Sequence, residues 1–321
     1  MQNVNGPLFN LVRAGLGFGW DSLPELSPEE WRAVYESAAR QSVQGVVFSA
    51  VESLPYDSPS RPPKALLARW ALDVQGIESF SRRNRAVMLK QKEVWDRRGV
   101  DAVLLKGWSV AQYYPQPERR VSGDVDWWMR TPEAWDKALA VLASNGIKPE
   151  TDSDGDIHYE LGGVVVEHHR SGLVEDGPAG VLFLLNTHIL HHAMVMGVGL
   201  RQLCDYAVAR EAFRRESGDG WPAVLGRYGE LAAAGGLTKW TAVLDGAVAE
   251  IGLPDADVDP SVRRKSLRLL DLVIADGNFG LDKRNRFGGF FSRAGLLLGI
   301  CPGTFIRRWL SLAAGRIRRL V

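Results

Sequence analysis

Two aspartates, Asp124 and Asp126, lie two positions apart directly after Gly123. If this segment is a strand, side chains alternate between its faces, so both carboxylates point the same way. Two acids on one face repel each other unless a cation lies between them, and a hard divalent cation such as Mg²⁺ is the usual solution. The spacing therefore predicts a metal site of the kind used in phosphoryl or nucleotidyl transfer.

A third acid, Glu167, follows the apolar run 164–166. A charged side chain is unexpected at the end of such a run unless it has a partner. Acids on neighbouring strands of one sheet can bind two Mg²⁺ or Mn²⁺ ions about 4 Å apart. Glu167, or a water molecule that it holds, is then expected to take the proton from the attacking hydroxyl.

A basic and glycine-containing segment precedes the acids. Lys106-Gly107 follows an apolar run, and Ser109 is close by. Lysine supplies a point charge to a phosphate, and glycine lets backbone N–H groups approach it. The Ser122-Gly123 pair in front of Asp124 also leaves backbone room. We therefore expect these positions to bind the phosphates of a nucleotide.

A small sheet is needed to position these residues. Segments 103–105 and 124–129 read as strands, and 157–161 and 164–168 read as a hairpin, because Gly162-Gly163 suits a two-residue turn. That turn pairs Leu161 with Val164, and the same register makes His158 and Glu167 cross-strand neighbours on one face.

Helices are expected on both sides of this sheet. Ser27-Pro28-Glu29-Glu30 predicts a capping box and a helix to about residue 42. Segment 64–98 has helical spacing, and Thr131 opens another helix that closes near residue 145. The sequence thus predicts an α/β (α+β) protein with three parts: an N-terminal helical region (1–98), a mixed-sheet core (99–176) and a helical C-terminal domain with a basic tail (177–321).

Several of these motifs together resemble a known family. Leu104-Leu105-Lys106-Gly107, Tyr114-Pro115, the segment 120–126 and Val166-Glu167-His168 resemble the uncharacterised bacterial nucleotidyltransferase family of the DNA polymerase β superfamily. The resemblance covers about residues 103–169, and 200–205 is similar to that family's helical C-terminal signature. It implies a small mixed sheet backed by helices, with Asp124 and Asp126 as the metal-binding pair and Glu167 as the third acid.

The resemblance also implies an activity: transfer of a nucleoside monophosphate from an NTP, with ATP expected, to a hydroxyl acceptor, with release of pyrophosphate. The acceptor could be a small molecule, a protein side chain or an RNA end. One departure matters, because the superfamily's Gly-Ser phosphate loop is replaced here by Lys106-Gly107-Trp108-Ser109. The alternative is therefore a catalytically inactive nucleotide-binding or regulatory protein that keeps the fold.

Three residues near the acids each have more than one interpretation. Arg120 could clamp a phosphate or form a structural ion pair. Trp128 shares a face with the aspartates and could stack on a base or pack in the core. His158 could orient Glu167, donate to a phosphate or simply complete a sheet pair.

The helical region after residue 177 adds further candidates for the cleft. His188, His191 and His192 share one helix face and could bind a transition metal, pack against another helix or line the cleft. Arg201 and Asp205 are one helical turn apart and could form a surface pair. The resemblance places them in the cleft instead.

Composition and the absence of several motifs indicate the compartment of the protein and exclude some classes of site. The chain has 321 residues, a net charge of +1, and only two cysteines without a CxxC motif, which fits a reducing cytoplasm. No uncharged apolar run reaches about 18–20 residues, so a membrane-spanning helix is not expected. No GxGxxG, Walker A, zinc-cluster or Gly-x-Ser-x-Gly pattern occurs. The acidic run 152–156 lacks calcium-loop spacing and reads as a solvated turn.

The charge of the chain is unevenly distributed. Residues 261–321 hold 13 Lys/Arg against 3 Asp/Glu, so the rest of the chain is acidic. A basic tail could meet nucleic acid or a lipid surface, or it could be a solvated helix face. An amphipathic helix over 304–320 would permit peripheral membrane association.

Overall fold

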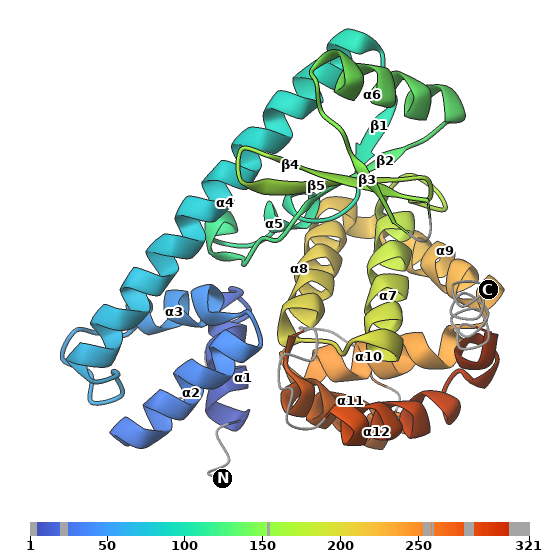
Figure 1. The fold of residues 1–321 in the computed structure, drawn as a ribbon. Helices are drawn as coiled ribbons and strands as arrows, with labels where there is room; N and C mark the ends of the chain where they lie inside the picture. The colour runs from blue at the N-terminus through green and yellow to red at the C-terminus, as the bar shows by residue number, and fades with distance from the viewer. Residues whose placement is uncertain are drawn as a thin grey trace.

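The computed structural model describes residues 5–19, 25–152, 155–252, 258, 260–278 and 286–307. It confirms the predicted α+β class: helices surround one five-stranded mixed sheet (Figure 1). Among the helices of these residues, none combines the length and the apolar character that crossing a membrane requires. Most of the predicted amphipathic helix 304–320 lies outside the described residues.

Three short helices begin the fold, and a capping box fixes the second of them. The Ser27 hydroxyl accepts a hydrogen bond from the Glu30 N–H, and the Glu30 carboxylate accepts one from the Ser27 N–H, as predicted. The helix ends slightly earlier than expected, because Ser42 adopts φ 55° and turns the chain. The bounds are α1 (Asn5–Gly15), α2 (Pro28–Arg40) and α3 (Gln44–Ser53).

A single long helix connects these helices to the sheet. The helical segment 64–98 is one helix, α4 (Lys64–Arg98), of 35 residues. Gly99 ends it in a left-handed conformation (φ 62°), which glycine adopts without steric cost. In Figure 1, α4 runs along one side of the molecule from the N-terminal helices to the sheet.

The sheet has the strand order β1-β2-β5-β4-β3. Strands β2 and β5 are parallel and all other neighbours are antiparallel. The predicted hairpin register is confirmed, with Leu161 opposite Val164 and His158 opposite Glu167. The bounds are β1 (Ala102–Leu104), β2 (Val125–Met129), β3 (Glu150–Thr151), β4 (Ile157–Leu161) and β5 (Val164–His169).

One face of the sheet is a hydrophobic core. Trp127 and Val166 are buried there against α4 and against α6 (Pro132–Ser144), whose first turn is capped by Thr131. Gln91 of α4 reaches into this core, where its amide accepts from the Trp127 indole and donates to the Tyr159 hydroxyl. Since side chains alternate along a strand, the residues between these apolar ones point to the opposite face.

A second, larger core joins both ends of the chain. Leu11 and Leu200 are fully buried in it. The fully buried Gln41 amide donates to the Val273 carbonyl and accepts from the Leu200 N–H. The bounds of the C-terminal helices are α7 (Pro178–Val195), α8 (Leu200–Ser217), η2 (Gly218–Gly220), α9 (Trp221–Ala234), α10 (Thr238–Glu250), α11 (Arg263–Asp276) and α12 (Arg286–Leu298).

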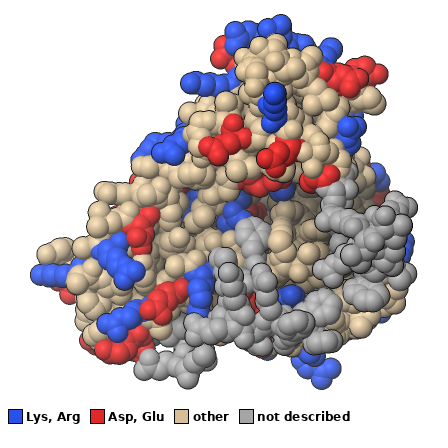
Figure 2. Space-filling model, in the orientation of Figure 1, with Lys and Arg blue, Asp and Glu red and all other residues tan. Residues whose placement is uncertain are grey.

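The described surface carries both charge signs. On the face shown in Figure 2, lysines and arginines are interspersed with aspartates and glutamates. Much of the basic tail falls at 279–285 and 308–321, which lie outside the described residues. A nucleic-acid or lipid contact through the tail therefore stays a prediction.

Candidate active site

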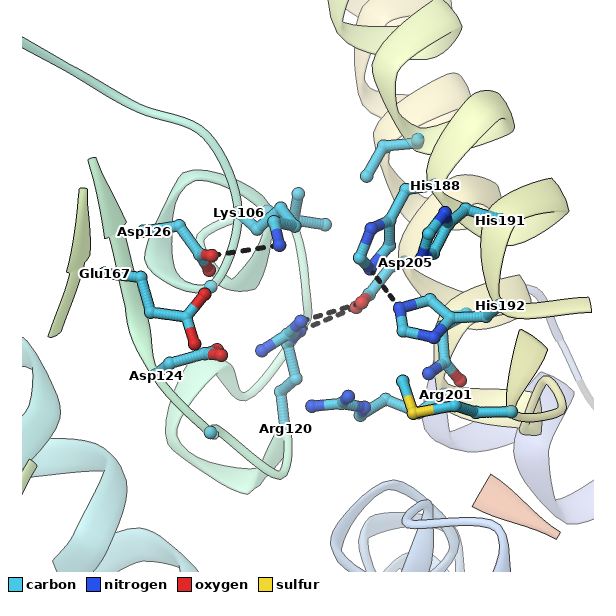
Figure 3. A pocket seen from close by; sticks show the side chains of 16 residues that line it. Lys106, Arg120, Asp124, Asp126, Glu167, His188, His191, His192, Arg201 and Asp205 are labelled. Atoms are coloured by element: carbon cyan, nitrogen blue, oxygen red, sulfur yellow. Dashed lines mark hydrogen bonds and ion pairs between the residues drawn. The ribbon is translucent and has the colours of Figure 1, made fainter. Parts of the chain in front are cut away.

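A cavity of about 470 Å³ lies where the free face of the sheet meets α7 and α8 (Figure 3). It brings together residues from both halves of the chain. The sheet and the segments that connect its strands contribute Lys106, Gly107, Val110, Arg120, Gly123, Asp124, Asp126 and Glu167. Helices α7 and α8 and the turn between them contribute Leu185, His188, His191, His192, Met196, Arg201, Gln202 and Asp205.

The three predicted acids gather on one side of this cavity. Asp126 in β2 and Glu167 in β5 are direct partners across the parallel strand pair. Asp124 lies just before β2, and its carboxylate lies close to that of Glu167 (Figure 3). Asn84 of α4 holds this entry to β2, because its amide donates to the carbonyls of Gly123 and Asp124.

Lys106 neutralises part of this negative charge. Its Nζ lies 2.9 Å from Oδ1 of Asp126, whose side chain is only 1% exposed. The position follows from the backbone, since the Leu105 N–H donates to the Asp126 carbonyl and sets the end of β1 beside β2. Burial opposes ionisation of Asp126, but Lys106 and His169 outweigh it and hold the pKa of Asp126 below its usual range.

The turn after Lys106 depends on Gly107, which has φ 70°. The short helix α5 (Trp108–Ala111) follows this turn, and the 3₁₀ helix η1 (Pro117–Arg119) comes after it. A Cβ at Gly107 would lie 3.4 Å from the Asp124 carbonyl oxygen and would require a strained backbone. This turn thus brings a backbone segment close to the acids.

The structure adds His169, which the sequence interpretation did not include. Its Nε2 lies 2.9 Å from Oδ1 of Asp126 and 3.5 Å from Oε2 of Glu167. Its Nδ1 lies 2.8 Å from Oδ2 of Asp156. Burial disfavours the charged ring, but the carboxylates of Asp126 and Asp156 outweigh it and raise the pKa of His169.

The sequence pattern could have indicated both His169 and Asp156. The alternation that aligns Asp124 with Asp126 also aligns Glu167 with His169, and the hairpin register extended by one pair sets Asp156 opposite His169. The prediction that 152–156 is a solvated turn fits the exposed Asp152, whereas Asp156 is only partly exposed and contacts His169 and the Arg170 N–H.

This donor set fits a divalent cation. One ligand atom each from Asp126, Glu167 and His169 lies within 4.8 Å of the others. Asp124 stands beside this group, and its pKa is raised by burial and then by the charge of Asp126. Burial, and then Asp124, also raise the pKa of Glu167. Acids that disfavour each other's charge in this way are stabilised by a cation between them.

The opposite wall is organised by an ion pair. Arg120 contacts Asp205 through two parallel hydrogen bonds, Nε to Oδ1 at 2.6 Å and Nη2 to Oδ2 at 2.7 Å. The Tyr114 hydroxyl donates to the same Oδ1 at 2.7 Å. Of the two interpretations of Arg120, the structure shows the ion pair. Arg201, beside it, donates from Nη1 to the Val121 carbonyl at 3.0 Å.

Three histidines of α7 complete this wall. The Nε2 atoms of His188 and His192 are 3.0 Å apart, and the ring of His191 contacts that of His192. Burial and then the charge of Lys106 lower the pKa of His188 well below its ordinary value. Burial and then His191 lower the pKa of His192 to about 4. The rings of His188 and His192 are therefore neutral at pH 7.

Two predicted phosphate-binding serines do not belong to the lining of this cavity. Ser122 Oγ lies 3.4 Å from Ser81 Oγ on α4. Ser109 Oγ is buried in the short helix after Gly107. The structure thus places Lys106, Gly107 and Gly123 at the cavity but turns both hydroxyls elsewhere.

Trp128 and His158 also lie outside the cavity lining. Trp128 packs against Gly172, where a Cβ would lie 2.3 Å from the indole, and the Arg130 guanidinium lies 5.2 Å from its ring. His158 is the strand partner of Glu167, but its Nε2 lies 3.5 Å from a carboxylate oxygen of Glu150 on β3. Both arrangements match the packing and sheet-pair interpretations.

Comparison with known proteins agrees with this geometry. Residues 27–181 match the model of a family described as uncharacterised nucleotidyltransferase. The matched span includes Lys106, the three acids and His169. No curated protein and no solved structure matches the chain. Residues 27–181, which carry the whole acidic side of the cavity, are therefore similar to a nucleotidyltransferase-type family.

Proposed function

We propose that the protein moves a nucleoside monophosphate from an NTP, with ATP the expected donor, to a hydroxyl acceptor and releases pyrophosphate. The observation that carries this proposal is the meeting of Asp124, Asp126 and Glu167 at one cavity with Lys106 among them. The family match supports nucleotidyl transfer in general. The metal, the nucleotide and the acceptor are part of the proposal.

The acids have distinct roles in this proposal. Asp124, Asp126 and Glu167 would hold Mg²⁺ or Mn²⁺. When bound, such an ion supplies positive charge that offsets the charge developing on the transferred phosphate. Glu167 is 35% exposed at its side chain and has a raised pKa, so it is suited to accept the proton of the acceptor hydroxyl.

The cations of the cavity would bind the phosphates. Lys106 reaches the acids from the turn at Gly107, so its ammonium group is within reach of a phosphate that approaches them. Arg201 lines the opposite wall and faces the same space (Figure 3). Arg120 is engaged by Asp205 and would act mainly by fixing this wall.

The size of the cavity bears on the acceptor. A volume of about 470 Å³, bounded by helices, favours a small molecule or a single protein side chain. An RNA end remains an acceptor candidate because of the basic tail.

One observation favours a second candidate, a nucleotide-binding or regulatory protein without turnover. The Lys106 ammonium group lies within 2.9 Å of Asp126, so it can serve as a permanent countercharge in place of a metal ion. Such a protein would bind NTP without converting it.

The two candidates differ in product formation. We would incubate the protein with each α-labelled NTP, Mg²⁺ or Mn²⁺ and a cell extract, and follow the label. The enzyme should transfer label to an acceptor, and Asp126→Asn should reduce transfer to background. Glu160→Gln, at an exposed position of the same hairpin, is the matched control and should keep it. Binding of NTP without any labelled product would support the second candidate.

A further inference from the structure

We propose that His169 is itself a metal ligand and that Asp156 holds it in place for this role. The site would then be a mixed oxygen–nitrogen site that prefers Mn²⁺ to Mg²⁺. This inference rests on the proposed function for the presence of a divalent ion. It adds a ligand that neither the DxD pattern nor the family resemblance supplies.

The donor distances carry the first step. Two ligands that bind one ion at right angles, each at about 2.1 Å, lie about 3 Å apart. Nε2 of His169 lies 2.9 Å from Oδ1 of Asp126 and 3.5 Å from Oε2 of Glu167. Nε2 of His169 and Oδ1 of Asp126 are therefore spaced as two ligands of one ion, and all three donor atoms lie within 4.8 Å of one another, so side-chain rotations would complete the fit.

The second ring nitrogen supplies the next step. A metal-binding histidine almost always gives its other N–H to a carboxylate or a carbonyl, which fixes the ring and its tautomer. Nδ1 of His169 has such a partner in Oδ2 of Asp156, at 2.8 Å. Asp156 is fixed in turn, because its Oδ1 accepts from the Arg170 N–H at 2.9 Å. Nε2 is left facing the acids.

The order along the strand makes this arrangement rigid. Glu167 and His169 are alternate residues of β5, so both point to the cavity face, while His168 between them is buried in the sheet core. His168 contacts the Tyr159 hydroxyl at 3.0 Å on that other side. A ligand on a central strand is held more precisely than a ligand on a loop.

The mixed ligand set predicts a metal preference. Carboxylates suit Mg²⁺ and Mn²⁺ alike, whereas an imidazole nitrogen favours a transition metal over Mg²⁺. Mn²⁺ is such a metal, although it binds less tightly than the later divalent ions of its row. To hold the ion, the ring would carry its one proton on Nδ1, toward Asp156, and Nε2 would be unprotonated. The remaining ring is neutral and offers one lone pair to the ion.

The test uses the whole 321-residue chain with Mn²⁺ as the only added ion and without nucleotide. Pulsed electron paramagnetic resonance detects a coordinated imidazole nitrogen, and histidine labelled with ¹⁵N identifies the residue type. We expect nitrogen coupling in the wild type and its loss in His169→Ala and in His169→Gln, with Mn²⁺ affinity lowered by at least about tenfold, because even the loss of an outer-shell partner costs that much. Asp156→Asn should weaken Mn²⁺ binding by about tenfold.

A matched control is available on the neighbouring strand. His158 is the strand partner of Glu167, but it lies outside the cavity lining. His158→Ala should keep the nitrogen coupling and the Mn²⁺ affinity. Absence of nitrogen coupling in the wild type, absence of Mn²⁺ binding, or unchanged coupling in His169→Gln would overturn the inference.

This outcome is separate from that of the proposed function. If nitrogen coupling is present and α-labelled NTP is not converted, the catalytic proposal fails and the ligand assignment stands. If NTP is converted but the Mn²⁺ spectrum lacks nitrogen coupling, the ligand assignment alone is wrong.

Discussion

The buried pair of Arg120 and Asp205 should fix the cavity wall that faces the acids, because it ties the segment before β2 to α8. Asp205 accepts two hydrogen bonds from Arg120 and one from Tyr114, all at 2.6–2.7 Å, and both charged side chains are at most 9% exposed. Asp205→Ala leaves a buried guanidinium group without a countercharge, which costs about 3–5 kcal/mol. The orphaned Tyr114 hydroxyl adds roughly 1 kcal/mol.

Urea unfolding followed by circular dichroism measures this loss in the free energy of unfolding. Replacing both partners by apolar residues, Arg120→Met with Asp205→Leu, should restore most of the stability, because no buried charge is then left alone. The exposed pair of Arg82 and Glu118 is the control, since Glu118→Gln should cost less than about 1 kcal/mol. A loss in Asp205→Ala as small as that of the control would refute this reasoning.

Three further predictions follow from contacts elsewhere in the molecule. Gln91→Leu removes two buried hydrogen bonds between α4 and the sheet and should lower the free energy of unfolding by about 2–4 kcal/mol in the same urea assay. Lys106→Met removes the ammonium group that competes with a metal for Asp126, so calorimetry without nucleotide should show roughly tenfold tighter Mn²⁺ binding; weaker binding would contradict the competition. The pKa of His192 is lowered to about 4 in the folded protein, whereas a histidine in the unfolded chain has a pKa of about 6.5. As the pH falls below about 6.5, the unfolded state therefore binds a proton that the folded state does not yet bind. Stability present above pH 6.5 is then lost between 6.5 and 4, and His192→Gln should reduce this slope by at most about 1.4 kcal/mol per pH unit; an unchanged slope would refute it.

Local rules predicted much of the sheet and the acidic side of the site. The Gly162-Gly163 turn sets the hairpin register, and the register sets Glu167 on the cavity face. Alternation along a strand aligns Asp126 with that face in the same way. These features depend on neighbours in sequence or on one turn, so a single sequence contains them.

The opposite wall could not be derived in this way. Arg120 and Asp205 are 85 positions apart, and their contact depends on how α8 packs against the sheet domain. The residues themselves fitted a phosphate clamp equally well. His169 differs from this pair, because the hairpin register by itself sets it opposite Asp156, so a single sequence contains that contact.

Nucleotidyl transfer differs from phosphoryl transfer in which phosphorus atom of ATP reaches the acceptor. The direct measurement compares ATP labelled at the α-phosphate with ATP labelled at the γ-phosphate, using the wild type and Asp126→Asn in the presence of Mn²⁺ and a cell extract. Nucleotidyl transfer predicts that acceptor label comes only from the α-position, that γ-label leaves as pyrophosphate, and that Asp126→Asn forms neither product. Label transferred from the γ-position, or transfer from the α-position that persists in Asp126→Asn, would contradict nucleotidyl transfer at these acids.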